Sequence, residues 1–131
     1  MQNMSGGKTA LGLDNNVGAL VCYLNICVPA GLIYSIIVLV TDKANKLPRF
    51  HAMQSLLWTA VTIVTVVVIE ILLVVVALVT QSGALATLLG LLVWVAILGL
   101  IALGIFAGYK GYTGETFKLP VIGDMADKWS N

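Results

Sequence analysis

The stretch Thr65-Val-Val-Val-Ile-Glu-Ile-Leu-Leu-Val-Val-Val-Ala-Leu-Val79 decides the fold, because it is too long and too apolar to be anything but part of a membrane span. A hydrocarbon core of about 30 Å requires about 20 consecutive apolar residues in a helix. The valines and threonines would suit a strand in water. Lipid, however, cannot satisfy the unpaired backbone of a strand, so the stretch predicts a transmembrane helix.

The composition extends this prediction to the whole chain. Of its 131 residues, 60% are hydrophobic and 10% are charged, whereas soluble domains carry about 25% charged residues. The apolar residues form three blocks, each long enough to cross the membrane. We therefore predict a single all-α integral membrane domain over residues 1–131, with three transmembrane helices at about 17–40, 52–79 and 84–109 and a surface tail at 110–131.

Pro29 and Gly31 interrupt the first block. Proline removes a backbone donor and kinks a helix. Two half-spans would each be too short to cross the membrane. We therefore expect one tilted or kinked span over residues 17–40.

The tail contains a second helical pattern. Ile122, Met125, Ala126 and Trp129 recur at helical spacing, with charged residues elsewhere on the wheel. This pattern predicts a short amphipathic helix lying on the membrane surface. The alternative is an irregular polar tail, which Pro120 would favour.

The basic residues predict the orientation. With three spans, the N-terminus shares one side with the 80–83 turn, and this side carries only Lys8. The other side carries Lys43, Lys46, Arg49, Lys110, Lys118 and Lys128. Basic loops stay in the cytoplasm. We therefore expect the protein in the inner membrane of the cell, with its N-terminus outside and its tail in the cytoplasm.

Glu70 is the one charged residue within the spans, and a carboxylate there costs about 2.5–3.5 kcal/mol on insertion scales. At about 100° per residue, it shares one sector of its helix with the polar side chains of His51, Ser55, Thr59 and Thr62. The hydroxyls can bond to their own helix and mark only a packing face. The alternatives are a proton or ion path and a site for a partner subunit or a polar cofactor group.

Trp94 lies near the middle of the third block, although tryptophan favours the membrane interface. The turn near Ser82 is equally far from Glu70 and Trp94, so a hairpin would place both at one depth. We predict an indole hydrogen bond to Glu70. Asn25 is a third polar residue near that depth.

Gly104 and Gly108 form a G-x-x-x-G pattern in the third block. Small residues let helices approach each other closely, so these glycines predict a helix contact within the chain or to another subunit.

The sequence carries no pattern typical of an enzyme or a metal site. It has no phosphate loop, no nucleophile elbow and no ligand cluster with metal-site spacing, and His51 is the only histidine. We expect no catalytic residues and no metal. The net charge of +1 argues against nucleic acid as a partner.

Three stretches carry a resemblance to a known family: Gly12-Leu-Asp-Asn-Asn-Val-Gly-Ala-Leu-Val-Cys-Tyr-Leu24, Arg49-Phe-His-Ala-Met-Gln-Ser55 and Phe117-Lys-Leu-Pro-Val-Ile-Gly-Asp124. Together they resemble the Tic20-like family, small membrane proteins related to a chloroplast inner-envelope import component. The resemblance implies a fold of several membrane helices. It implies no chemistry, although chloroplast relatives are associated with protein import.

The leading hypothesis is a non-enzymatic membrane protein that works by helix packing, as an accessory or scaffold subunit of a larger complex, with photosynthetic and respiratory complexes among the hosts considered. Its partners would be the lipid bilayer and other membrane subunits. In a photosynthetic host, His51 would ligate the magnesium of a chlorophyll-type pigment; otherwise it is an interfacial side chain bonded to a neighbouring loop. A lipid is the second candidate, beside the pigment, for a bound cofactor. The alternative is a translocon-like or channel-like homo-oligomer that uses Glu70 and the threonine stripe.

Overall fold

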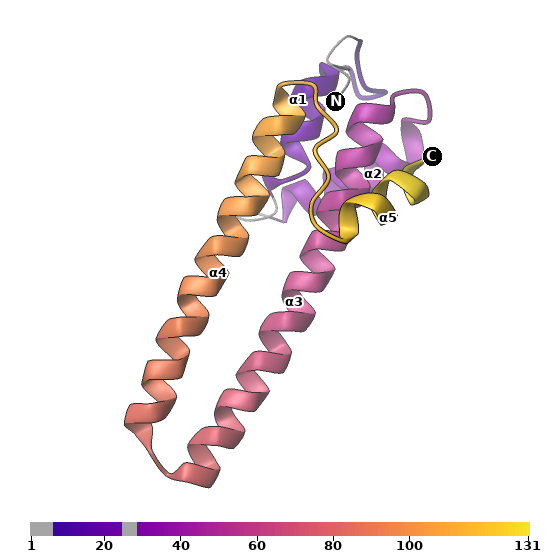
Figure 1. Ribbon diagram of the computed structural model, residues 1–131. Coiled ribbons are helices and arrows are strands. Elements are labelled where there is room, and N and C mark those ends of the chain that lie inside the picture. The colour runs from indigo at the N-terminus through magenta and orange to yellow at the C-terminus, as the bar shows by residue number, and fades with distance from the viewer. Residues whose placement is uncertain (1–6, 25–28) are drawn as a thin grey trace.

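The protein is described by a computed structural model covering residues 7–24 and 29–131, and Figure 1 shows how its helices are arranged. In chain order they are α1 (Asn15–Val21), α2 (Ala30–Thr41), α3 (Lys46–Thr80), α4 (Gly83–Tyr112) and α5 (Ile122–Ser130). The described ranges contain no strand beyond an isolated bridge between Lys8 and Asp14. The all-α prediction is therefore confirmed for these ranges.

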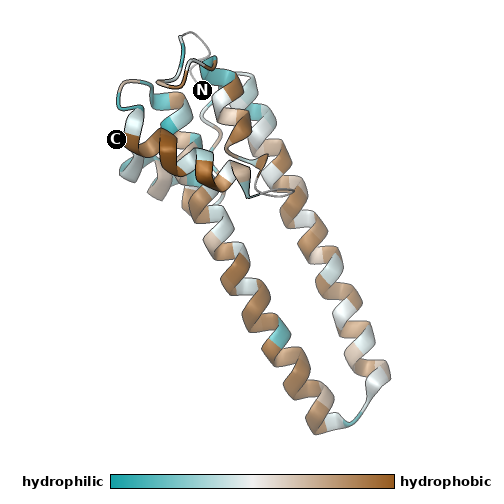
Figure 2. Cartoon of the chain, turned by 180° about the vertical axis from the view of Figure 1, so that it is seen from behind, coloured by the Kyte–Doolittle hydropathy of each residue, from teal (hydrophilic) through white to brown (hydrophobic). Residues whose placement is uncertain are grey.

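Two long helices form a hairpin that extends away from the rest of the molecule (Figure 1). α3 has 35 residues and α4 has 30, and both are long and apolar enough to cross a membrane. Only 0% and 6% of their most apolar windows are buried, unlike the core helix of a soluble protein. Figure 2 shows that most of the length of both arms is coloured as hydrophobic.

The predicted turn joins the arms. Gln81 adopts a left-handed conformation with φ 50°, and the Ser82 side chain caps α4 by accepting a hydrogen bond from the Leu85 amide at 3.2 Å. A serine at this position satisfies an amide that has no partner within the helix. The turn therefore ends α3 and starts α4 within two residues.

The arms face each other along a regular seam. Half-buried positions recur with spacings of three and four at residues 59, 62, 66, 69, 73 and 76 of α3. On α4 the matching positions are 86, 89 or 90, 93, 97 and 100. This is the spacing of two helices that pack side by side along their length. Each arm therefore turns one stripe to the other arm and the remaining surface outward.

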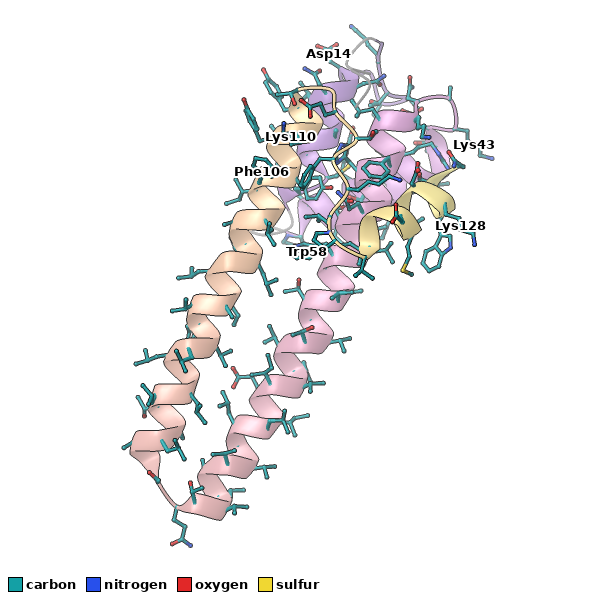
Figure 3. All side chains as sticks on the ribbon, in the orientation of Figure 1. Asp14, Lys43, Trp58, Phe106, Lys110 and Lys128 are labelled. Atoms are coloured by element: carbon teal, nitrogen blue, oxygen red, sulfur yellow. The ribbon has the colours of Figure 1, made fainter. Side chains whose placement is uncertain are left out.

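The opposite end of the molecule is a compact head. We define the head as residues 7–24, residues 29–58, which include α2 and the start of α3, residues 104–112 of α4, and the tail from residue 113 with α5. The buried hydrophobic core lies here and includes Cys22, Val38, Ala52, Ala107 and Leu119. Figure 3 places the labelled charged residues in the head, away from the turn of the hairpin.

The first apolar block does not form the single span predicted over 17–40. α1 ends at Val21 and α2 begins at Ala30, and both pack against α3. The start of α1 lies beside the loop that follows α2, because the Asn15 side-chain amide donates to the Asn45 side-chain oxygen at 3.2 Å. Pro29 stands at the N-cap of α2, where a missing amide hydrogen costs nothing. The proline therefore starts a new helix instead of kinking a continuous one.

The N-terminal segment consequently lies at the end opposite to the one predicted. The Asn45 side-chain amide donates to the Lys8 carbonyl at 2.8 Å, and the Ala10 backbone amide donates to the Asp42 carboxylate at 3.2 Å. These bonds hold the N-terminal segment against the loop between α2 and α3. The expectation that it shares a side with the 80–83 turn is therefore wrong.

The predicted tail helix is present as α5, but only part of its apolar surface is available to a membrane. Ile122 and Ala126 are buried in the head, where α5 packs against α3. Met125 and Trp129, which lie next to them on the helix, are 37% and 51% exposed. α5 thus docks through one stripe and presents a second.

Candidate functional site

The polar centre of the head is built around His51, which α3 carries into a fully buried position. Its Nε2 lies 2.8 Å from the Glu115 carbonyl oxygen, and its Nδ1 lies 3.0 Å from the Tyr23 hydroxyl. A carbonyl can only accept, so Nε2 carries the proton and Nδ1 accepts from Tyr23. Both ring nitrogens of His51 are therefore used.

Gln54, one turn further along α3, completes the network. Its amide nitrogen donates to the Tyr23 hydroxyl at 2.8 Å and to the Phe117 carbonyl at 2.9 Å. Its amide oxygen accepts from the Leu119 amide at 2.9 Å. The buried Gln54 side chain thus pairs with one carbonyl and one amide of the tail backbone, as the backbone of a neighbouring strand would.

This network holds the tail in place, and its polar side-chain atoms are bonded within the chain. The two nitrogens of His51, the hydroxyl of Tyr23 and both amide atoms of Gln54 have partners within the chain. The hypothesis that His51 ligates a pigment magnesium is therefore corrected, because neither ring nitrogen has a free lone pair for a metal. The alternative prediction, a histidine bonded to a neighbouring loop, describes its contact with Glu115.

Arg49 joins three helices at the edge of the head. Its guanidinium donates to the Leu39 and Asp42 carbonyls at the end of α2, at 2.8 and 3.1 Å, and its Nε donates to the Ser130 carbonyl of α5 at 2.8 Å. The last carbonyls of a helix lack partners and carry partial negative charge, so a cation stabilises them. Arg49 therefore caps α2 and α5 together from the first turn of α3.

Two lysines bind the tail through carboxylates. Asp127 of α5 lies 3.2 Å from Lys46 Nζ and 3.0 Å from Lys118 Nζ, and Asp124 also lies 3.0 Å from Lys118. Hydrogen bonds from Lys118 and Lys46 hold the pKa of Asp127 below its ordinary value. Bonds to Asp124 and Asp127 raise the pKa of Lys118. Ion pairs on such an exposed surface contribute little.

The upper part of the predicted polar stripe points into the protein. The Ser55 hydroxyl is buried, 2.9 Å from that of Ser35 on α2, and the Thr59 hydroxyl donates to the Ser55 carbonyl at 2.8 Å. The Thr62 hydroxyl is buried without a hydrogen-bond partner among the described residues. It lines a hollow of about 200 Å³ between the arms, with Trp58 and Leu100 among its walls. Figure 3 places Trp58 at the base of the head.

Glu70 and Trp94 do not form the predicted hydrogen bond within the chain. Glu70 is exposed on α3, and Trp94 on α4 is 63% exposed. Within the described part of the chain, neither side chain has a hydrogen bond or ion pair. Asn25 lies outside the described residues. The stripe therefore divides into a bonded part, from His51 to Thr59, and an unbonded part on the arm, which consists of the Thr62 hydroxyl and the Glu70 carboxyl group.

The glycines of α4 lie where helices meet. Gly104 and Gly108 are both buried, and a Cβ added to Gly108 would lie 3.3 Å from Leu20 and Tyr23. Gly111, one turn later, is tighter: a Cβ there would lie 2.9 Å from the Ala19 Cβ and 3.2 Å from the His51 ring. The contact is therefore made with α1 and α3 of the same chain.

Reasoning from the sequence missed Tyr23, Gln54 and Arg49 as site residues. A signal for them existed, because all three belong to the stretches quoted for the family resemblance. The structure brings those stretches together: the first supplies Tyr23, the second supplies Gln54 and the third supplies Phe117 and Leu119. The three stretches, which are far apart in the sequence, therefore meet in one hydrogen-bond network.

Known proteins resemble the chain over nearly its whole length. The model of the magnetosome magnetite crystal formation protein family matches residues 14–126. A UPF0132 membrane protein of Methanocaldococcus jannaschii is 34% identical over 129 residues, covering 95% of this chain and 96% of the relative. A UPF0132 membrane protein of Archaeoglobus fulgidus is 31% identical over 116 residues, covering 88% and 95%.

These comparisons do not support the Tic20-like resemblance, although they confirm a family of small membrane proteins. No solved structure matches the chain. A second M. jannaschii relative, also named a UPF0132 membrane protein, is 32% identical over 124 residues, covering 92% of this chain and 73% of its own length. The chain belongs to the magnetosome magnetite crystal formation protein family, and its relatives include the UPF0132 membrane proteins.

Proposed function

We propose that this chain is a non-enzymatic integral membrane protein that works by helix packing, as a small structural subunit of a membrane assembly. The observation that carries the proposal is the contrast between its two ends. The polar side chains of the head are used to hold the chain's own segments together. The arms, in contrast, expose apolar side chains such as Val68, Leu78 and Leu98.

Such a chain acts through the surfaces that it offers to other molecules. Lipid covers the apolar surface of the arms, and other helices can pack against the same surface. The family description associates its members with magnetosome magnetite crystal formation. We carry over to this chain only the idea of a membrane-embedded part of an assembly.

We propose a cytoplasmic head and an exterior turn. The sequence has seven lysines and arginines, and each belongs to the head, including Lys8, whose carbonyl is bonded to Asn45. Basic segments remain in the cytoplasm. In intact cells, a cysteine introduced at Gln81 should react with an impermeant thiol reagent, and cysteines at Lys8 and Lys118 should not. Labelling at Lys118 but not at Gln81 would reverse the orientation.

Purification in a mild detergent tests the subunit role. The tagged chain should retain other membrane proteins at a fixed stoichiometry, and the set should be lost in a harsher detergent. Recovery of the chain alone as a homo-oligomer would contradict the proposal.

That result would favour the alternative of a channel-like component, for which the lone Glu70 carboxyl and the unpartnered Thr62 hydroxyl are the supporting observations. Reconstituted vesicles would then show ion flux that Glu70→Gln abolishes.

A further inference from the structure

Glu70 is a polar side chain in an apolar surface that lipid alone cannot satisfy. It is exposed on α3, between the exposed side chains of Val67 and Val74, and no described residue bonds to it. A carboxyl group at this depth in a membrane is expensive without a partner. A hydrogen-bonding group from a neighbouring molecule would satisfy it.

Trp94 is the complementary group. Its indole N–H is a donor only, its side chain is 63% exposed, and no described residue accepts from it. Glu70 lies eleven residues before Gln81, and Trp94 lies twelve after Ser82. At about 1.5 Å per residue, each is about 17 Å from the turn, so both lie at one depth.

The two side chains also lie on one face of the hairpin. Each directly follows a seam position, Ile69 on α3 and Val93 on α4. The next residue of a helix is rotated by about 100°. Because the arms are antiparallel, rotation in the chain direction carries both side chains to the same side of the plane through the arms. One face of the hairpin thus carries an acceptor on one arm and a donor on the other.

We infer that a second copy of this chain packs face to face on that surface, so that Glu70 of each copy accepts a hydrogen bond from the partner's Trp94. A two-fold axis parallel to the arms places α3 of one copy opposite α4 of the other without changing depth. Every such dimer contains two equivalent bonds, as an isologous interface requires. The inference rests on the proposed structural role and names the partner.

The surroundings of Trp94 favour close approach. Gly90 lies one turn away on the same face, and a Cβ placed there would meet nothing within 4 Å. Small residues let helices of separate chains approach closely in lipid. On the other arm, Ile63 and Val74 are 58% and 57% exposed on the matching face. A second copy therefore finds room beside the indole and apolar surface around it.

A mixing experiment tests the pairing, because the two bonds of the dimer can be removed separately. Glu70→Leu and Trp94→Phe would be made in chains with two different affinity tags and expressed together. A pair of Glu70→Leu copies has no bond, and so has a pair of Trp94→Phe copies. A mixed pair keeps one, between the intact Glu70 of one copy and the partner's intact Trp94. A bond within each chain would give no such advantage.

The fraction of one tag retained by the other, measured in lipid nanodiscs, gives the result. We expect the mixed pair to exceed either matched pair by about threefold to tenfold, the range for one hydrogen bond between membrane helices. Glu70→Gln, which keeps an acceptor, should dimerise as the unmodified chain does, and so should Trp129→Phe as the control in α5. Equal retention in mixed and matched pairs, or a monomeric unmodified chain, would overturn the inference.

The outcome is separate from the test of the subunit role. Copurifying membrane proteins without self-association would retain the proposed function and remove the dimer. Self-association without other proteins would retain the dimer and remove the proposed function.

Discussion

Replacing Gln54 with leucine should release the tail from the head while leaving the hairpin intact. Gln54 is fully buried and satisfies the Phe117 carbonyl and the Leu119 amide. Leucine fills a similar volume but leaves both backbone groups without partners. Each buried group left unsatisfied costs about 1–3 kcal/mol, and the added apolar burial of leucine returns about 1–2 kcal/mol. We expect the docked tail to lose about 2–3 kcal/mol of stability relative to the released tail.

Trypsin cleavage after Lys118 measures this loss. The cleaved peptide bond lies between Phe117 and the amide of Leu119, the two groups that Gln54 binds. Cleavage therefore requires the tail to detach from the head, and the cleavage rate follows the fraction of molecules with a detached tail. A loss of about 2–3 kcal/mol corresponds to cleavage about 30- to 150-fold faster. Tyr23→Phe leaves the buried His51 Nδ1 without its donor and should cost about 1–3 kcal/mol. Thr87→Val, in the distant arm, is the control. Cleavage of Gln54→Leu within about twofold of the unmodified chain would refute the reasoning.

Three further changes test other contacts of the head. Gly111→Ala should destabilise the head by about 1–3 kcal/mol through overpacking. Gly99→Ala, with nothing within 4 Å of an added Cβ, should instead stabilise α4 by up to about 1 kcal/mol. Thermal unfolding, followed by the same tryptic cleavage, distinguishes the two variants, and equal effects would contradict the packing. Arg49→Lys should lose about 2–4 kcal/mol, because one ammonium cannot reach three carbonyls on two helices, and fast tail release at neutral pH would be the evidence. Acid should loosen α5 slightly, because exposed ion pairs contribute little. The pKa of Asp127 is lowered by its lysine partners, so this small contribution is present above the ordinary carboxyl pKa of about 4 and is lost as pH falls through the lowered value. The emission of Trp129, in a chain with no other tryptophan, should change only in that acid range, and a change near neutral pH would disprove the assignment.

The arms and the turn could be predicted from the sequence because their signals are local. An apolar stretch such as residues 65–79 has one stable form in lipid, and the polar residues at 80–83 interrupt it. The periodicity of Ile122 and Ala126 likewise predicted α5. In each case the information lies within a few turns of one helix.

The break in the first apolar block could not be predicted in this way. Length and hydropathy are the same for one span as for two short apolar helices that fold back, so Pro29 could be assigned to either. The difference depends on bonds between distant residues, such as Lys8 with Asn45. The same holds for His51, whose partner Glu115 is 64 positions away along the chain. Pairings of this kind become visible only when the fold brings the segments together.

The position of Gln54 and His51 has a consequence for the order in which the chain is made. Both belong to the start of α3, yet the backbone groups that satisfy them belong to residues 115–119, which the ribosome adds after α4. In the fold, the tail returns to the head only after the chain has descended one arm and ascended the other. A nascent chain whose hairpin has failed to insert leaves these buried groups without partners, and the head cannot close. The head can therefore close only after the hairpin has reached its final position.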